Sequence, residues 1–537
     1  MPSIRQLPSA SAGTRLVFRV NGDQMVLNDV VTGTIWVPDH SMAVINNWSQ
    51  VAPQNNNDAN DQPDADTDAA NDLTLSRTDC TKTSAPPSAK ADSYGVRSGH
   101  PTVLDVMDND ATSDCSVSVI DSVDVPPADG AVQIVDDGRA LQIDPAQGAA
   151  GQLAPIAYRI SDGQGHSSTA TVTVSVVPAG TSLPPKKVRP SAMVIASGGT
   201  ASHNVLADWI SPSGDSLFLT GAALPGGASQ VSSGTGDPSG GDTLSYASDG
   251  TISLRDAGTG AATKKTVTFV VSDGVNTAQG TLTVDVVPDA NLVPVPSPVY
   301  ARTVVGRPVT VHPLTTVLSI GSDPLRLSAV TPPTDQPTLH VQPDLDSGAA
   351  TISADTPGTY YLGFQVTAGS QPATGVIRVD VVDPPAGTAA AAPTAVGDVA
   401  FLAPGGTARV DLTANDSDPS AGVLAVQQVT IDPSSPLQVR LTDMHIAEVT
   451  SRRALPPAGV WFSYTVASGS ATATGWVHVI GVATAPEQTP IASPIALVVR
   501  AGDAVTQSVT GFALDPGGSA LTVQDFDPLP NGSGVLF

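Results

Sequence analysis

The feature that most constrains this chain is a short pattern that returns four times along the sequence. Each copy has an apolar run led by an aromatic residue, then a turn that ends in Gly, then a second run in which apolar and polar residues alternate. The aromatic residues are Tyr158, Phe269, Phe364 and Tyr464, so the copies lie 111, 95 and 100 residues apart. A period of this length is that of a complete domain, and it predicts tandem copies of one fold.

The second run of each copy predicts a β-strand with one apolar face. In the first copy, Val172, Val174 and Val176 alternate with Thr171 and Thr173. A period of two places the two sets on opposite faces of a strand. The Ser-Asp-Gly before this run predicts a hairpin turn, because Gly readily adopts the positive φ that tight turns need.

The spacing of strands and turns predicts the fold of each repeat. Roughly seven strands in about 95 residues, with turn signals about every 8–12 residues, are typical of an immunoglobulin-like β-sandwich. The expected fold class is all-β, with tandem immunoglobulin-like β-sandwich domains and a short N-terminal β-sheet fragment. The predicted bounds are 86–180, 184–289, 294–385 and 393–484 for repeats 1 to 4, and 488–537 for a partial repeat 5.

The first 85 residues follow a different pattern. Residues 1–52 predict a β-strand fragment, because apolar alternation flanks Asn21-Gly22, a strong short-range signal for a hairpin. Residues 53–85 predict an acidic, disordered linker, since this tract is rich in Asn and Asp and has no apolar period.

Composition supports an all-β chain and argues against helical proteins and nucleic-acid-binding proteins. The 537 residues include 48 Asp but only 2 Glu, with 6 Lys and 6 Met. Glu, Lys and Met favour helices, whereas Asp favours turns. The net charge of −26 argues against a nucleic-acid partner, because phosphate contacts need basic stripes.

No membrane-spanning segment is predicted, because no window holds 18 consecutive apolar residues. The N-terminus has no apolar core of a signal peptide. We therefore expect any signal and anchor to lie outside this chain.

The repeats resemble the tandem Ig-like and cadherin-like domains of large bacterial surface proteins of actinobacterial type. The resemblance covers residues 86–537 and is carried by VLDVMDNDATSD, VDLTANDSDPSAGVLAV and the Tyr-x-Ile-Ser-Asp-Gly strand end followed by TATVTV. It implies a cadherin-like or fibronectin type III-like sandwich that is secreted, extracellular or at the cell surface and serves adhesion. The N-terminal strands resemble the end of a propeller-like module.

Acidic loops in repeats 1 and 4 are candidate calcium sites by the same resemblance. Asp108, Asp110 and Asp114, and Asp416 and Asp418, are similar to the Asp-rich loops that chelate calcium between cadherin repeats. Calcium takes six to eight oxygen ligands, so several carboxylates must converge on it. The alternative is that these residues cap turns, which Asp does without a metal. No other cofactor is expected.

Two further predictions concern the cysteines and a tryptophan. If the protein is exported, Cys80 and Cys115 predict a single disulfide between the linker and repeat 1; otherwise they are inert thiols. Trp476 and His478 alternate with Val477 and are expected on the outer face of repeat 4. Trp476 is therefore a candidate ligand-binding residue, and the alternative is that it packs against a neighbouring domain.

Gly214-Asp215-Ser216-Leu217 matches the nucleophile block of the GDSL hydrolases. In those enzymes the Ser lies on a strand-to-helix turn, and its partners come from a later Asp-x-x-His. Neither a helix signal nor that pattern follows here, so we expect a loop and the next strand of a sandwich. No catalytic residue is predicted, and the chain is not expected to be an enzyme.

Together these features predict a non-catalytic structural or adhesive stalk in a large exported cell-surface protein, with other proteins or surface glycans as partners. Two alternatives stay open. A carbohydrate-binding accessory region of a secreted enzyme would need clustered exposed aromatic residues, and only 4% of the residues are aromatic. A fragment of a propeller-containing enzyme would have its catalytic part upstream.

Overall fold

The computed structural model describes most of residues 86–483 and short strands on either side of that range. Within it, the undescribed positions are 113–115, 125–129, 147, 179, 226–240, 259, 289–292, 319–324, 334–335, 370 and 386–390. Outside it, the described residues are 16–21, 24–29, 35–37, 43–45, 491–492, 513–514 and 522–523. The chain divides into two compact units, Met1–Thr74 and Leu75–Phe537.

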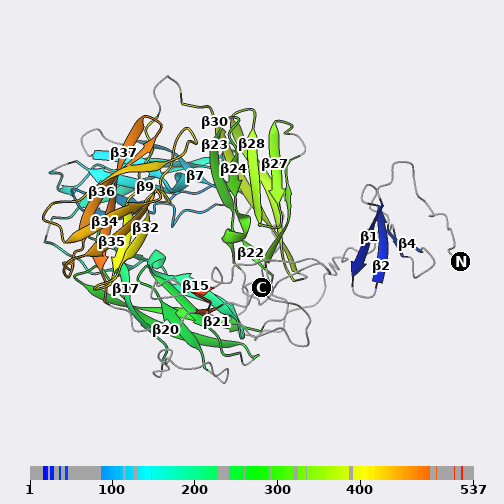
Figure 1. The fold of residues 1–537 in the computed structure, drawn as a ribbon, viewed down its shortest axis with the longest axis horizontal. Coiled ribbons are helices and arrows are strands. Elements are labelled where there is room, and N and C mark those ends of the chain that lie inside the picture. The colour runs from blue at the N-terminus through cyan, green and yellow to red at the C-terminus, as the bar shows by residue number, and fades with distance from the viewer. Residues whose placement is uncertain are drawn as a thin grey trace, which may run out of the picture. The chain divides into compact units, whose positions relative to one another are not determined.

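The first unit contains one antiparallel sheet with the strand order β1-β2-β3-β4 (Figure 1). Its strands are β1 (Leu16–Asn21), β2 (Gln24–Asp29), β3 (Ile35–Val37) and β4 (Ala43–Ile45). β1 and β2 pair up to Asn21 and Gln24, which confirms the hairpin expected at this point of the sequence.

The second unit contains the repeats. Repeat 1 comprises β5 (Asp92–Val96), β6 (Thr102–Leu104), β7 (Val119–Asp124), β8 (Gly130–Val135), β9 (Ala140–Pro145), β10 (Gly151–Gln152), β11 (Ile156–Ser161), β12 (Ser167–Val176) and the 3-10 helix η2 (Asp136–Gly138). Repeat 2 comprises β13 (Lys186–Lys187), β14 (Ser191–Ala196), β15 (Thr200–Asn204), β16 (Trp209–Ile210), β17 (Phe218–Ala223), β18 (Thr243–Tyr246), β19 (Thr251–Arg255), β20 (Thr263–Ser272), β21 (Thr277–Val287) and η3 (Val205–Asp208).

The remaining strands belong to repeats 3 and 4 and to the segment after them. Repeat 3 comprises β22 (Val295–Pro296), β23 (Val299–Val304), β24 (Val309–Val311), β25 (Val317–Leu318), β26 (Leu325–Thr331), β27 (Leu339–Asp344), β28 (Ala349–Ala354), β29 (Gly358–Ala368), β30 (Gln371–Val382) and η4 (Pro313–Thr316). Repeat 4 comprises β31 (Asp398–Leu402), β32 (Ala408–Asp411), β33 (Ala425–Thr430), β34 (Leu437–Thr442), β35 (Ile446–Ser451), β36 (Val460–Ser468) and β37 (Ala471–Gly481). A short pair, β38 (Ile491–Ala492) and β39 (Ala513–Leu514), follows.

Each repeat packs a larger sheet against a three-stranded sheet, which confirms the all-β sandwich class (Figure 1). In repeat 4, for example, the larger sheet has the order β31-β37-β36-β33 and the smaller has the order β32-β35-β34. The same connectivity recurs in repeats 2 and 3. In all four repeats the first strand of the larger sheet runs parallel to the last strand of the repeat.

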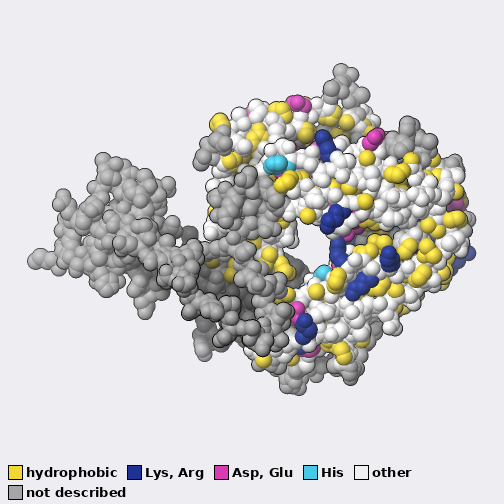
Figure 2. Space-filling model, turned by 180° about the vertical axis from the view of Figure 1, so that it is seen from behind, with side chains coloured by type: hydrophobic (Ala, Val, Ile, Leu, Met, Phe, Trp, Pro, Cys, Tyr) yellow, Lys and Arg dark blue, Asp and Glu magenta, His cyan; other side chains and the backbone are white. Residues whose placement is uncertain are grey.

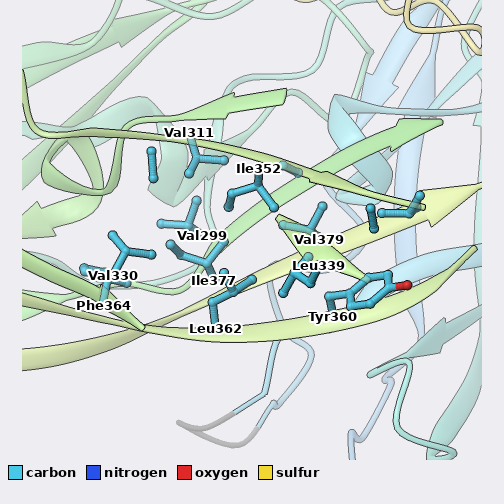
Figure 3. Packing of buried hydrophobic residues seen from close by; sticks show 14 of the residues in the cluster. Val299, Val311, Val330, Leu339, Ile352, Tyr360, Leu362, Phe364, Ile377 and Val379 are labelled. Carbon is cyan, nitrogen blue, oxygen red and sulfur yellow. The ribbon is translucent and has the colours of Figure 1, made fainter. Parts of the chain in front are cut away.

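A separate hydrophobic core lies between the two sheets of each repeat. In repeat 3, Tyr360, Leu362 and Phe364 of β29 face Val311 and Ile352 of the opposite sheet (Figure 3). Because apolar side chains from both layers bury one another, every repeat carries its own source of stability.

The alternation and the turns of the repeated pattern are as expected. Val172, Val174 and Val176 are at most 4% exposed, and the residues between them are exposed or partly exposed. Gly163 and Gly274 have φ values of 69° and 89°, in the left-handed region that a Cβ disfavours. The two glycines therefore have the conformation for which the hairpin turns require them.

Charged side chains are sparse on the surface, in keeping with a charged fraction of 14%. On the face drawn in Figure 2, uncharged and hydrophobic side chains predominate, with acidic and basic groups scattered among them. No helix among the described residues is both long and apolar enough to cross a membrane.

Several predicted features lie outside the described residues. These are Cys80, Cys115, Asp114 and the whole linker at 53–85. The disulfide and the disordered linker therefore stay predictions.

Candidate functional site

In repeat 1, a tyrosine hydroxyl and two aspartates meet just ahead of the first strand. Tyr158 Oη lies 3.0 Å from Asp92 Oδ2 and 3.4 Å from both carboxyl oxygens of Asp110. The same hydroxyl lies 2.9 Å from the Lys90 carbonyl oxygen, while the Lys90 N–H donates to Asp110 at 2.7 Å. Asn109 donates its side-chain amide to Asp92 at 2.8 Å. The phenol thus joins two carboxyl groups to the segment that leads into β5.

Repeat 4 contains the same arrangement around Tyr464. Its hydroxyl lies 3.1 and 3.2 Å from the two carboxyl oxygens of Asp416 and 3.3 Å from the Val396 carbonyl oxygen. The Val396 N–H donates to Asp416 at 2.8 Å. Asn415 and Tyr464 favour the ionised form of the Asp398 carboxyl group and so act to lower its pKa, but its Oδ2 atom is buried without a partner.

The strand register shows that the two clusters are equivalent. In repeat 1, Tyr158 lies opposite Ala170, and Asp92 pairs with Val172, two positions further along the same strand. In repeat 4, Tyr464 lies opposite Gly475, and Asp398 pairs with Val477, again two positions further. Two isolated bridges, Ser88–Ala111 and Thr394–Ser417, place Asp110 and Asp416 at equivalent points of the loops that follow β6 and β32. We call each group of one tyrosine and two aspartates a tyrosine–aspartate cluster.

Repeats 2 and 3, whose aromatic residue is Phe, have other residues at the same positions. In the order tyrosine, strand aspartate and loop aspartate, the equivalents are Phe269, Ser191 and Asp208 in repeat 2, and Phe364, Val299 and Val317 in repeat 3. In these four repeats the hydroxyl occurs only where two carboxyl groups meet. A half-buried carboxyl group needs a donor, so the tyrosine and its aspartates act as one unit.

Burial raises the pKa of these carboxyl groups above the usual value of 3.8. Burial, together with the charges of neighbouring aspartates, raises the pKa of Asp92 to about 6. Burial and the charge of Asp416 raise the pKa of Asp398 to about 8, and burial raises the pKa of Asp416 to about 6. At neutral pH the cluster of repeat 4 therefore holds a proton.

Several candidate calcium ligands already have partners within the protein. Asp108 pairs with Arg189 of repeat 2 at 3.3 Å. Asp418 accepts two backbone N–H groups at 2.7 and 2.8 Å and the Ser468 hydroxyl at 2.5 Å, which is the geometry of the turn-capping alternative. The described part of the chain contains no group of three or more His, Cys, Asp or Glu arranged to hold a metal. Calcium binding stays a prediction.

Trp476 is half-buried, and a residue of repeat 1 covers part of it. The His100 ring lies edge-on to Trp476 with a centroid distance of 4.9 Å, and it also stacks on Trp461 at 4.2 Å. His478 alternates with the core residues Val477 and Val479, as expected, but it is only 7% exposed because Trp461 stacks on it at 4.2 Å and Ser216 of repeat 2 bonds to it. The contact with His100 matches the packing alternative, and ligand binding by Trp476 stays a prediction.

The Gly-Asp-Ser-Leu motif is followed by strand β17, as expected, and not by a helix. Ser216 Oγ nevertheless lies 2.9 Å from His478 Nδ1, and His478 Nε2 lies 2.9 Å from the Ala458 carbonyl oxygen. The neighbouring Asp215 does not support the histidine, because Arg97 binds its carboxylate at 2.6 and 2.9 Å. The pair therefore lacks the third, charged member that activates a catalytic serine.

A cleft of about 940 Å³ lies between repeats 1, 2 and 4. Its lining includes the rings of His100, Phe218, Phe401 and Trp461 and the carboxylate of Asp215. A concave surface with aromatic rings and a few polar groups has the chemical make-up of a small-ligand site.

The sequence analysis missed Asp92 and Asp398 as members of a site. A signal for them was present in the repeats, because Tyr replaces Phe in the two copies whose first strand begins with Asp. Aligning the copies on their aromatic residue and on the start of their first strand reveals this substitution pattern. The partners of His478 left no signal, because they come from distant parts of the chain.

Residues 84–175 match the family model of the bacterial Ig domain, and this range contains the Tyr158 cluster. No curated protein matches the chain.

Several solved structures match this chain over much of its length, at low TM-scores. The N-terminal four Ig domains of Dscam1 isoform 9.44 are 11% identical, with 74% of this chain and 100% of that chain covered and a TM-score of 0.23. Drosophila N-cadherin EC1-4 is 12% identical, with 73% and 99% covered and a TM-score of 0.21. An endo-fucoidan hydrolase from glycoside hydrolase family 107 is 16% identical, with a TM-score of 0.18; 57% of this chain is covered, but only 45% of the hydrolase. At these scores the similarities carry no argument about function.

Proposed function

We propose that this chain is a non-catalytic array of Ig-like repeats in an exported bacterial cell-surface protein, where it acts as a structural or adhesive stalk. The observation that carries the proposal is that four consecutive repeats each have their own sandwich and their own core. Modules of this kind can be joined in tandem without a shared core. The match of residues 84–175 to the bacterial Ig domain supports the same function.

Location is tested on intact cells that produce the full-length protein. We expect antibodies against residues 86–483 to label unbroken cells, and protease added outside to remove the epitope. A cytoplasmic protein that stays intact serves as the control for lysis. If the epitope is protected until the cells are broken, the proposed location is wrong.

Adhesion is tested with an in-frame deletion of repeats 1 to 4. If these repeats present or form an adhesive region, the deletion should reduce binding of the cells to their surface or partner. If the deletion strain displays the shortened protein and adheres normally, repeats 1 to 4 are not needed for adhesion and act only as a spacer.

A second candidate function, glycan binding, is favoured by the cleft between repeats 1, 2 and 4. Its aromatic rings can stack on sugar faces, and the carboxylate of Asp215 can accept hydrogen bonds from hydroxyl groups. Calorimetric titration of the whole chain with a panel of oligosaccharides tests it. We expect Phe401→Ala, which removes a partly exposed ring of the cleft lining, to abolish binding and Phe401→Tyr to retain it. If no oligosaccharide binds the wild-type chain, this candidate fails.

A further inference from the structure

The parallel pairing of first and last strands is common to all four repeats. β5 pairs with β12, β14 with β21, β23 with β30 and β31 with β37, with five registered pairs in repeats 1 and 4 and six in repeats 2 and 3. The first strand of the larger sheet follows the linker that enters a repeat and a short paired segment at the end of that linker, and the last strand precedes the linker that leaves the repeat. Both ends of each repeat therefore meet in a single hydrogen-bonded ladder.

This arrangement determines how a pull on the two linkers would act. The incoming linker pulls the first strand backward along its axis, and the outgoing linker pulls the last strand forward. In a parallel pair these forces are opposite and lie along the strands, so the evenly spaced hydrogen bonds are loaded in shear, all together. An antiparallel hairpin pulled at its open end would instead lose its bonds one after another.

The segment just ahead of the first strand is also held in every repeat, at the same position. In repeats 1 and 4 the tyrosine–aspartate clusters bind both the N–H and the carbonyl group of Lys90 and of Val396. In repeat 2 the equivalent Arg189 pairs with Asp208 at 2.7 Å. In repeat 3 the equivalent Ser297 exchanges hydrogen bonds with Thr316 at 3.0 and 3.1 Å.

The chemistry of these attachments differs, but their position does not. They lie between the short paired segment at the start of each repeat and the ladder, so tension from the linker reaches them before it loads the ladder. Charged acceptors make the attachments of repeats 1, 2 and 4 stronger than the neutral pair of repeat 3.

We propose that the repeats bear tension along the chain, through the shear-loaded parallel ladders, and that Tyr158 and Tyr464 hold the leading segments against this load. This inference rests on the proposed function as a stalk and gives it a mechanical role. Some contacts between repeats involve ladder strands, since Arg378 of β30 donates to repeat 1 and His478 of β37 bonds to Ser216 of repeat 2. These side-chain contacts contain fewer hydrogen bonds than a ladder, so we expect them to separate before any sandwich unfolds.

Single-molecule pulling on the full chain by its two termini tests the inference. We expect one unfolding event for each repeat, with a gain in length of roughly 300 Å for about 90 residues at 3.3–3.6 Å each. In shear, the ladder fails after sliding by about one residue, or ~3.3 Å, so the unfolding rate should depend only weakly on force. A several-fold longer distance to the transition state would indicate stepwise unzipping and would overturn the proposal.

Two variants test the tyrosines, and a third is their control. Tyr158→Phe and Tyr464→Phe should each lower the force of one event and raise its unfolding rate at zero force about 10-fold, the effect of losing one hydrogen bond to a charged group. Tyr360→Phe also removes a hydroxyl from a core tyrosine, but that hydroxyl bonds to Thr356 of its own segment. It should leave the unfolding forces unchanged.

Equal effects of all three variants would assign the tyrosines a general packing role and would contradict the inference. Its failure can be told apart from failure of the proposed function. Surface location is measured on cells, whereas the mechanical response is measured on the purified chain.

Discussion

The hydroxyl groups of Tyr158 and Tyr464 stabilise the partly buried carboxyl groups of the two tyrosine–aspartate clusters. A phenol donates only one hydrogen bond, yet the Tyr158 hydroxyl meets two carboxyl groups and two backbone carbonyl groups. The Tyr464 hydroxyl meets the carboxyl group of Asp416 and the Val396 carbonyl group. In repeat 4 one oxygen of Asp398 also lacks a donor. A proton on that carboxyl group removes its negative charge, which costs most when the oxygen is buried without a donor.

Lowering the pH from about 8 to about 5 should therefore stabilise repeat 4. The folded state raises the pKa of Asp398 to about 8 and that of Asp416 to about 6, from 3.8. It therefore binds protons that the unfolded state releases, and the free energy of unfolding rises as the pH falls from about 8 to about 4. Hydrogen exchange of β36 and β37 in the full chain, corrected for the intrinsic effect of pH, should slow accordingly.

Repeat 3 provides an internal control for this pH response, because it has Val299 where repeat 4 has Asp398. The variant Asp398→Asn should reduce the response of repeat 4, since an amide does not titrate. The same response in repeats 3 and 4 would contradict this explanation.

Thermal melting with calcium and with a chelator tests the predicted ligands Asp108, Asp110 and Asp416. If they bind calcium, the melting midpoint should rise with calcium, because a ligand of the folded state stabilises that state. The rise should be larger at pH 8 than at pH 6, since calcium needs the ionised carboxylates. Identical midpoints with calcium and with chelator would remove the prediction.

At the scale of strands, a glycine lies opposite the aromatic ring in three of the four repeats. The glycines are Gly280, Gly375 and Gly475, where an added Cβ would approach ring atoms to 2.4, 2.3 and 2.2 Å. Each ring lies over its glycine, so the last strand needs Gly for close packing and not for a turn. Repeat 1 differs, because Ala170 lies opposite Tyr158.

Gly475→Ala should destabilise repeat 4 by about 1–3 kcal/mol, the usual cost of overfilling a packed core. The Tyr464 ring must shift, and its hydroxyl then moves away from Asp416. Thr472→Ala, an exposed change on the same strand, should alter stability by less than about 0.5 kcal/mol. Urea unfolding followed by tryptophan emission compares the two variants, and equal midpoints would show that the ring adapts freely.

At the scale of the whole unit Leu75–Phe537, side chains connect repeats that are not adjacent in sequence. Gln142 of repeat 1 donates to the Ala395 carbonyl oxygen and accepts the Gly397 N–H of repeat 4, both at 2.9 Å. Its amide therefore pairs with the backbone of the segment that leads into β31.

Arg378 connects repeat 3 to repeat 1 in a similar way. Its side chain is 4% exposed and pairs with Asp380 at 2.7 Å. It also donates to the carbonyl oxygens of Val117 and Ser161 at 2.7 and 2.6 Å. The acceptors are backbone carbonyl groups, which are present at every position of any sequence. No particular side chain in repeat 1 therefore predicts this contact.

Gln142→Ala should loosen the contact between repeats 1 and 4 without unfolding either sandwich. We expect faster hydrogen exchange at residues 395–397 and unchanged exchange in β36 and β37. Gln133→Ala, which changes the exposed cross-strand neighbour of Gln142, is the matched control and should have no effect. Faster exchange throughout repeat 4 would mean that Gln142 stabilises the sandwich itself.

The sequence predicted the sandwiches because their signals are local. The alternation at Val172, Val174 and Val176 and the turn at Gly163 each need only neighbouring residues, and both were confirmed. The clusters of repeats 1 and 4 could be predicted only in part. Asp110 and Asp416 were noticed as loop residues, but their tyrosine comes from a strand 48 residues further along.

By itself, the sequence determined the all-β class, the repeated strand pattern and the positions of its turns. These follow from periodicity and from the backbone preferences of Gly, Pro and Asp, which act over a few residues. The tertiary structure decided which carboxyl groups share a tyrosine, that His478 is covered, and that first and last strands lie parallel. Those outcomes depend on strand register and on packing between segments far apart in sequence. A shift of one residue in register moves every side chain of a strand to the opposite face of the sheet.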